Sequence, residues 1–362
     1  MNAPAADSTA NNSTANSSTA KRVSTYLQRR ARWSPFEIAF WVLAFASIWL
    51  FPGKYLILKD TAILALFALS LDLILGYAGI ISLGHAAFFG LAGYFSGLVA
   101  KYGLVTEPLV ALVLSGLVAA VLGFLTSFLV LRGSDLTRLM VTLGVSLMLG
   151  EVANRYSNIT GGADGLQGVE IAPILGRFRF DLYGHNGYVY CLIVLFLCFL
   201  LARRIVYSPF GLSLRAVKGN ALRAGAIGIP VKWRLVAIYT VSAGLAGIAG
   251  ALLTQTTAFC SLDVFSLERS ADLLLVLIIG GTGYLYGGLI GAVIYKLLQD
   301  WIANLTPQYW QFWIGLVLVI IVLIGRDRMS GWVTSLRAQG GRLGARLLPG
   351  SAALRRAEAD GP

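Results

Sequence analysis

The sequence predicts an all-α fold, a polytopic bundle of about eight to ten membrane spans that includes broken or re-entrant segments and a possible inverted repeat. Only 13% of the 362 residues are charged and 57% are hydrophobic, whereas a soluble domain carries about 25% charged residues. The mean hydropathy is +0.74. Uncharged runs long enough to cross a bilayer, about 20 residues each, recur along the chain. The composition therefore excludes an ordinary soluble protein.

The apolar runs give the approximate position of each span. We expect helices near 36–53, 60–78, 85–102, 108–131, 136–153, 188–202, 235–259, 271–298 and 310–325. Most of the 29 basic residues fall before the first run, at 132–138, within 203–234 and after the last run. Basic residues accumulate in cytoplasmic loops. These four regions, and both termini, are therefore expected in the cytoplasm.

Three parts of the chain differ in composition. Residues 1–32 begin with a low-complexity Ser, Thr, Ala and Asn stretch without the apolar region of a signal peptide, and we expect a disordered cytoplasmic tail. Residues 33–328 are expected to form the transmembrane domain, with 203–234 as a cytoplasmic loop. Residues 329–362 are Arg-rich and are expected to form a basic cytoplasmic tail.

The segment 271–298 is expected to be broken. If it crossed the membrane once, the basic C-terminal tail would be left on the outside. Five glycines interrupt this segment, at Gly280, Gly281, Gly283, Gly287 and Gly288, and each costs a helix interior about 1 kcal/mol. The sequence therefore predicts a re-entrant or discontinuous helix pair centred on Gly281–Gly288. A full crossing with an unusual topology is the alternative.

A second glycine-broken stretch, GYAGIISLGHAAFFGLAGY, occupies residues 76–94. Interrupted segments in the two halves of a chain are typical of inverted-repeat transporters, whose site lies between the repeats. The alternative is that the small residues only permit close helix packing, as we expect for AGLAGIAGA at 243–251. The two stretches together favour a transport pathway. Its candidate residues are Asp72, Gly79, Ser82, His85, Glu151, Gly281, Gly283 and Gly287.

Polar residues inside the predicted spans need partners, since a charge at the bilayer centre costs about 2.5–3.5 kcal/mol. Asp72 is expected either on the pathway or in a hydrogen bond between helices. Glu151 and Arg155 have the i, i+4 spacing of an ion pair. Asp272 is expected to cap a half-helix, and His85 to make a hydrogen bond at a helix end.

Several classes of function are excluded or disfavoured by missing motifs. The sequence has no G-x-x-x-x-G-K-[ST] phosphate loop and no nucleic-acid motif with interleaved aromatic residues. Its two histidines lie far apart, and its three cysteines fall in or beside apolar runs without metal-ligand spacing. The cysteines are expected to be small core residues. A membrane enzyme is therefore disfavoured.

The stretch from Arg203 to Arg234 carries seven Lys or Arg and no Asp or Glu. After Pro209, the residues Leu214, Val217 and Ala221 recur on one helical face, which predicts a short amphipathic helix. The two glycines and the proline that follow are expected to end it. Such a helix either lies on anionic lipid headgroups or seats in a cleft of a soluble motor domain.

Four motifs resemble those of one transporter family. SPFGLSLRAVKGNALRAGAIGI at 208–229 resembles the cytoplasmic loop of the permeases in ABC importers for branched-chain amino acids. The stretch at 76–94 is similar to that family's N-terminal signature, and TGGADGL at 160–166 to the outer loop of its LivM-type permeases. IIGGTGYLYGGLIGA at 278–292 is similar to its C-terminal glycine pattern. The resemblance covers roughly residues 60–325.

The resemblance implies a multi-pass permease subunit of an ATP-driven ABC importer in the bacterial inner membrane, which is itself not an enzyme. It implies four partners for this chain: a LivH-type permease, two ATP-binding subunits and a periplasmic solute-binding protein. This chain would bind no cofactor, and ATP and Mg would be held by the ATP-binding subunits. The residues implied for coupling to them are Ser208, Pro209, Gly211, Arg215, Gly219, Asn220, Arg223, Ala224 and Gly228.

The solute implied by the resemblance is a branched-chain amino acid (leucine, isoleucine or valine) or a related small amphipathic molecule. Permeases of the same family for urea, amides or aromatic acids are the nearest alternative. An ion-coupled secondary transporter is the alternative from another class. It would need intramembrane carboxylates that bind Na⁺ or H⁺. Asp72 and Glu151 are the candidates, and two carboxylates are few for this role.

Overall fold

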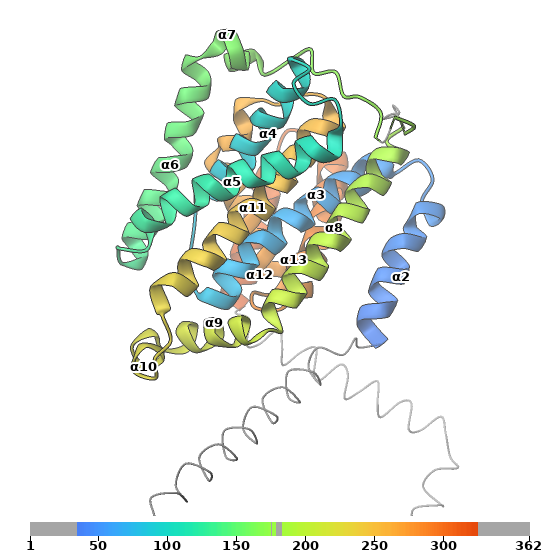
Figure 1. Cartoon of the computed structure of the whole chain (residues 1–362). Coiled ribbons are helices and arrows are strands. Elements are labelled where there is room, and N and C mark those ends of the chain that lie inside the picture. Colours follow the sequence, from blue (N-terminus) through green and yellow to red (C-terminus); the bar gives the residue numbers. More distant parts are fainter. Residues whose placement is uncertain (1–34, 175, 179–182, 325–362) are drawn as a thin grey trace, which may run out of the picture. The chain divides into compact units, whose positions relative to one another are not determined.

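A computed structural model describes residues 35–174, 176–178 and 183–324 of the chain (Figure 1). The two tails expected at 1–32 and 329–362 lie outside the described residues. The described residues belong to two units, one that ends at Lys296 and one that begins at Leu297. The first unit contains the features discussed below.

Helices account for nearly all of the regular structure, as the composition predicts. The long helices are α2 (Pro35–Leu50), α3 (Tyr55–Asp72), α4 (Ala86–Lys101), α5 (Pro108–Val130), α6 (Asp135–Arg155), α8 (His185–Val206), α11 (Val231–Thr257), α12 (Leu267–Gly280), α13 (Leu285–Leu305) and α14 (Trp310–Ile324). The short ones are η1 (Leu73–Ala78), α7 (Ser157–Thr160), η2 (Gly162–Asp164), α9 (Pro209–Gly219), α10 (Ala221–Ala226) and η3 (Leu262–Phe265).

Five of the described helices are long and apolar enough to cross a membrane alone. They are α3 together with its continuation η1, and α5, α6, α8 and α11. A sixth span results if the bent pair of α12 and α13 is counted as one, and α2 and α4 are shorter apolar helices. In the described part of the chain, β-structure is limited to two isolated bridges. The prediction of a polytopic helical bundle is confirmed.

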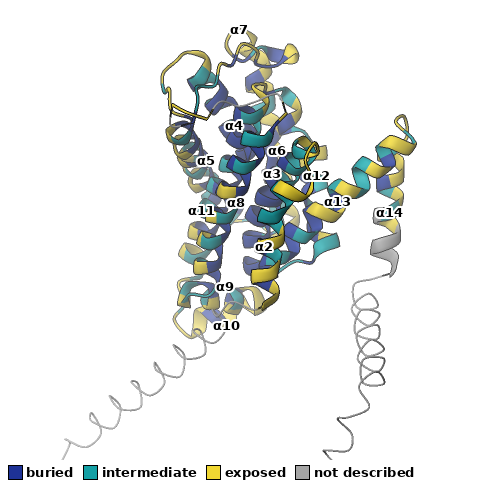
Figure 2. Ribbon diagram, turned by 90° about the vertical axis from the view of Figure 1, so that its right-hand side faces the viewer, coloured by how far each residue is buried: buried dark blue, intermediate teal, exposed yellow. Residues whose placement is uncertain are grey.

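Helix α11 is largely buried in the first unit and packs on α5, α4 and α3 (Figure 2). Its small residues make this possible. A Cβ atom at Gly250 would overlap the backbone of Phe89 in α4, and one at Gly247 would overlap Ala119 of α5. Small residues let helix backbones approach closely in membranes, where packing rather than the hydrophobic effect drives association. The packing role predicted for residues 243–251 is confirmed.

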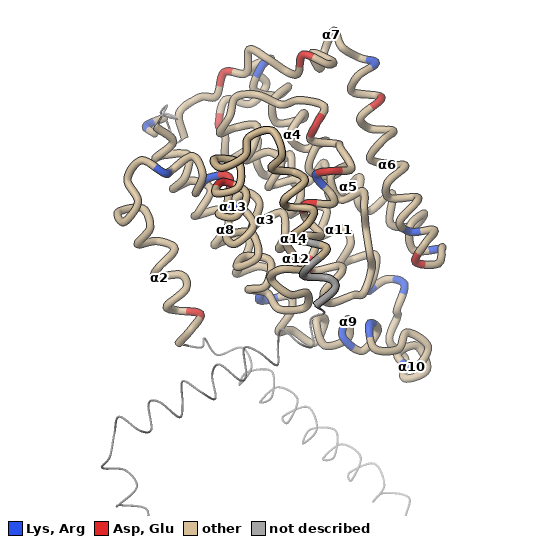
Figure 3. Tube along the Cα trace, turned by 180° about the vertical axis from the view of Figure 1, so that it is seen from behind, with Lys and Arg blue, Asp and Glu red and all other residues tan. Residues whose placement is uncertain are grey.

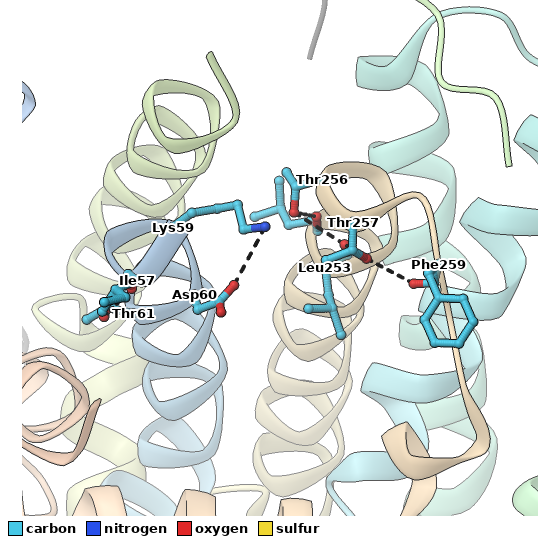
Figure 4. A network of polar contacts seen from close by, with 9 residues as sticks. Ile57, Lys59, Asp60, Thr61, Leu253, Thr256, Thr257 and Phe259 are labelled. Carbon is cyan, nitrogen blue, oxygen red and sulfur yellow. Dashed lines mark hydrogen bonds and ion pairs between the residues drawn. The ribbon is translucent and has the colours of Figure 1, made fainter. Parts of the chain in front are cut away.

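The two ends of the first unit are used below as landmarks. One end holds α7 and the other holds α9 and α10, and these are called the α7 end and the α9 end (Figure 1). At the α7 end, Thr257 donates to the carbonyls of Leu253 and Phe259, and Lys59 lies 3.7 Å from Asp60 (Figure 4). At the α9 end, Lys and Arg lie along α9 (Figure 3).

The segment predicted to be broken is indeed two helices. Helix α12 ends at Gly280 and α13 begins at Leu285, with a bend of 111° between them. The turn needs glycine, because Gly281 has φ +96° and Gly283 has φ +81°. The start of α13 then packs back along α12. Gly287 contacts Gly280, Gly291 contacts Val276, and the Tyr295 hydroxyl donates to Asp272. The pair is therefore a hairpin that returns toward the end from which α12 started.

Three local expectations are wrong. The basic strip is not one helix, because Asn220 leaves the helical conformation and caps α10 by accepting a hydrogen bond from the Arg223 amide at 2.9 Å. Glu151 and Arg155 are both exposed on α6 and form no salt bridge with each other. Asp272 lies in the second turn of α12 and binds Tyr295, while Ser266 caps that helix.

Candidate functional site

The two glycine-broken stretches meet at the α9 end of the first unit. The amide of Gly283, in the turn between α12 and α13, donates to Oδ1 of Asp72 at 2.7 Å. A Cβ atom at Gly76 would overlap both the Asp72 carboxylate and the Gly283 amide. Asp72 thus makes a hydrogen bond between elements, one of the two roles expected for it.

The chain after Asp72 leaves the α-helical conformation. Residues 73–78 form the π-helix η1, and Gly79 then turns with φ +74°. Short π-helical segments inside α-helices are rare and are frequently found at functional sites. The chain next passes α6, where the Leu83 amide donates to Thr142 and Gly84 leaves no room for a side chain against the Thr142 carbonyl. This segment returns the chain to the start of α4.

His85 joins three helices at the start of α4. Its Nε2 atom lies 2.9 Å from the Ser70 hydroxyl of α3 and 3.4 Å from the Ser242 hydroxyl of α11. The imidazole is 1% exposed and is flanked by the rings of Phe67 and Phe88. The helix-end hydrogen bond predicted for His85 is present, and the environment is that of a structural residue rather than of a proton carrier.

The other candidate pathway residues are distributed unevenly. Ser82 is buried in the segment before α4, and its hydroxyl has no hydrogen-bond partner among the described residues. Gly281 and Gly287 contact each other inside the α12–α13 hairpin. Glu151 is exposed on α6, in the half of that helix nearest α7. The structure therefore brings Asp72, Gly79 and the hairpin glycines together and leaves Glu151 apart.

The first residues of the basic strip build a corner between α8 and α9. Ser208 caps α9 by accepting from the Gly211 amide at 3.4 Å, and Pro209 follows at the first helical position. A Cβ at Gly211 would overlap the carbonyls of Ile205 and Val206. These three residues set the direction of α9.

Two cationic side chains of α9 face the bundle. The Arg215 guanidinium lies over the Tyr77 ring at 5.3 Å from its centroid. The Lys218 ammonium donates to the Gly76 carbonyl at 2.6 Å. Lys218 was not a candidate from the sequence, because a lysine in a basic strip carries no signal of a specific partner. Its partner is a backbone atom 142 positions away.

The remaining strip residues form an exposed surface at the α9 end. Leu222 is 88% exposed and Ile227 is 75% exposed, and Arg223 is exposed between them. Positions Gly219 and Gly228 have open space around them. Ala224 differs from Gly219, Arg223 and Gly228, since it is buried against the chain itself. We call Leu222, Arg223, Ile227 and the exposed residues between them the α10 surface.

A cavity of about 520 Å³ opens at the α7 end, between α4, α5, α11 and the connection before α8. Lys101 and Glu170 line it, together with the hydroxyl residues Ser96 and Thr106. Gln255 also lines it, and this side chain donates to Ser96 and to the Pro108 carbonyl while accepting from Tyr190. None of these residues was a candidate from the sequence, because they are polar residues of ordinary type without a motif.

The cysteines behave as core residues. Cys191, Cys198 and Cys260 are all buried and free. Burial raises the pKa of the Cys260 thiol, which lies beyond the end of α11, to about 12. A thiol in this state is a poor nucleophile and metal ligand, because both reactions require the thiolate.

Comparison with known proteins gives one consistent family. The family described as "Branched-chain amino acid transport system / permease component" matches residues 55–322. The LivM permease of the high-affinity branched-chain amino acid transport system of Salmonella typhimurium is 26% identical over 78% of this chain and 72% of its own length. No solved protein structure matches the chain.

More distant relatives differ in the solutes that their names give. A probable LivH branched-chain amino acid permease of Methanocaldococcus jannaschii is 27% identical over 53% of this chain and 62% of its own length. The ribose import permease RbsC of Bacillus subtilis is 30% identical over 44% of this chain and 53% of its own length. The similarity thus extends to permeases named for sugars as well as for amino acids.

Proposed function

Because the chain belongs to the family of permease components of branched-chain amino acid transport systems, we propose that it is the membrane subunit of an ATP-driven importer in a bacterial inner membrane. Its work is to open and close a path for the solute. The energy comes from other subunits, since the sequence has no phosphate loop of its own.

The observation that carries this proposal is the α10 surface. Leu222 and Ile227 are large apolar side chains that stand exposed beside Arg223 at one end of the first unit. Exposed apolar groups rimmed by charge are typical of a protein interface. A helix that only rested on anionic headgroups would place basic residues along its length, whereas Arg215 and Lys218 turn inward to Tyr77 and Gly76. We assign the α10 surface to an ATP-hydrolysing partner.

The cavity at the α7 end favours an amino acid as the solute. A zwitterion carries one charge of each sign, and Lys101 and Glu170 supply the two complementary charges at a single cavity. Urea and neutral sugars carry no charged groups to pair with these side chains. We therefore assign leucine, isoleucine or valine as the solute and place its access at this cavity.

The remaining subunits follow from the same proposal. A second permease of the LivH type would complete the membrane path, and a periplasmic binding protein would deliver the solute at the α7 end. Two ATP-binding subunits would act at the α9 end. Both termini of this chain then lie in the cytoplasm, as the distribution of basic residues favours.

Uptake of labelled leucine in cells that express the complete system tests the proposal. We expect uptake to stop when ATP is depleted and to persist when ionophores collapse the ion gradients. Unlabelled isoleucine and valine should compete, whereas ribose and urea should not. Uptake that follows the ion gradient instead would favour a secondary transporter and overturn the proposal.

A further inference from the structure

Three segments far apart in the sequence are tied together at the α9 end of the first unit. The Lys218 ammonium of α9 donates to the Gly76 carbonyl of η1 at 2.6 Å. The Gly283 amide of the α12–α13 turn donates to Asp72, just before η1, at 2.7 Å. The two hydrogen bonds connect α9 to η1, and the last residue of α3 to the hairpin turn.

The face of α9 that carries Lys218 is held against η1 by more than one contact. Arg215 lies one helical turn before Lys218 and therefore on the same face, with its guanidinium over the Tyr77 ring. Leu214 and Val217 are buried beside these two cations. The position of α9 therefore fixes the position of the Lys218 side chain.

The lysine stem fills the space between the two glycine breaks. A Cβ atom at Gly79 would lie 3.2 Å from Cγ of Lys218, and one at Gly283 would lie 3.9 Å from its Nζ atom. Both glycines have positive φ, so neither position accepts a side chain that could fill the space instead. Withdrawal of Lys218 would leave this space open.

Two side chains, those of Asp72 and Lys218, hydrogen-bond to the backbone of the two breaks. Gly79 and Gly283 have no side chains of their own, so the packing there depends on Lys218, which lies beside both of them. A hydrogen bond from an ammonium group is stronger than one between neutral groups. The Lys218 ammonium can therefore stabilise the closed arrangement of the two breaks.

We propose that Lys218 is a positioning residue that keeps the transport path closed at the α9 end, by tying α9 to both glycine breaks. The inference rests on the proposed function in one respect, that α9 and α10 form the element an ATP-hydrolysing partner moves. Movement of α9 away from η1 breaks the bond between Lys218 and Gly76. The Lys218 side chain then also leaves the space beside Gly283, so the hairpin turn keeps its bond to Asp72 but loses its neighbour on the α9 side.

Thiol labelling of the closed segment tests this role without nucleotide. The reporter is Ser82→Cys, because Ser82 is buried in the segment between η1 and α4 and its hydroxyl makes no hydrogen bond to the residues that the structure describes. The assembled complex is placed in membranes and exposed from the α9 side to a membrane-impermeant maleimide. The complex without the reporter gives the background from the three buried native cysteines.

We expect Lys218→Met to raise the labelling rate of the reporter by about tenfold, since a charge-assisted hydrogen bond then no longer holds the closed state. Lys218→Arg, which keeps a cationic donor, should restore most of the protection. The matched control is Lys232→Met, which removes an exposed lysine at the start of α11. It should leave the labelling rate unchanged.

Labelling in Lys218→Met that stays within about twofold of the parent would overturn the inference, because a loss of one charge-assisted bond predicts a larger change. If Lys218→Met does not accumulate in the membrane, Lys218→Gln provides the same test with a shorter, uncharged donor. A failure of the proposed function is distinguishable, because it is seen in uptake that ignores ATP depletion. The labelling result does not depend on ATP.

Discussion

At the scale of single residues, Gly76 marks the tightest part of the junction between the two broken stretches. Its Cα lies so close to Asp72 and to the Gly283 amide that even a methyl group has no space. The hydrogen bond between Asp72 and Gly283 depends on this approach. Glycine is therefore needed here for space rather than for an unusual φ angle.

We expect Gly76→Ala to destabilise the protein by about 1–3 kcal/mol, the usual cost of overpacking, and to reduce leucine uptake. Uptake in whole cells and thermal unfolding in detergent measure the two effects. The control is Gly144→Ala on α6, where a Cβ meets no atom within 4 Å. That change should be neutral or stabilising, since alanine favours a helix by up to about 1 kcal/mol. Equal behaviour of the two variants would contradict the geometry of the junction.

At the scale of elements, α2 is attached to the bundle by one buried ion pair and an aromatic cluster. Glu37 in the first turn of α2 pairs with Arg203 in the last turn of α8, and both side chains are about one-tenth exposed or less. Trp41 packs on the rings of Phe196 and Phe199 of α8. A buried pair specifies the contact strongly, because neither charge is stable there alone.

We expect Glu37→Gln to destabilise the protein by about 3 kcal/mol, because the Arg203 guanidinium then lacks its carboxylate in a buried position. The thermal unfolding midpoint and the protease sensitivity of the chain before α3 measure the effect. Asp135→Asn on α6 is the matched control. Its pair with Arg138 is exposed, so its loss should cost less than about 1 kcal/mol. Similar losses in both variants would show that α2 is held by its aromatic side chains alone.

The basic strip shows how a local cap overrides a helical pattern. The periodicity of Leu214, Val217 and Ala221 predicts one continuous helix, and the first two residues are buried as expected. Asn220 then competes for the backbone through its side chain, as Asn commonly does at a helix start. The consequence is functional, because the break turns α10 so that Leu222 is exposed rather than buried.

At the scale of the whole molecule, the class of fold and the positions of most helices could be predicted from the sequence. Long uncharged runs have few alternatives in a membrane, and glycine clusters mark a helix break wherever they fall. The residues that Asp72, His85 and Lys218 contact could not be predicted from the sequence. Asp72 and His85 were singled out because they are rare inside spans, but their partners come from distant segments.

Two parts of the candidate site could not have been predicted from patterns of residue types. Lys218 donates its hydrogen bond to a backbone carbonyl, which every residue possesses. No pattern of side chains in the sequence therefore predicts this bond. The cavity at the α7 end is lined by residues from four separate segments whose spacing has no period. Such sites are created by packing, which becomes known only when the helices have been placed.

We infer that the ATP-hydrolysing partner binds this subunit at the α10 surface and drives its movement from there. Disulfide cross-linking from Leu222→Cys in native membranes tests it most directly, since this side chain is 88% exposed. The comparison is Leu104→Cys between α4 and α5, which is 73% exposed at the α7 end. The account predicts that Leu222→Cys is joined to an ATP-binding subunit and that Leu104→Cys is not. A Leu222→Cys thiol that reacts with an impermeant reagent outside intact cells, and joins no ATP-binding subunit, would contradict it.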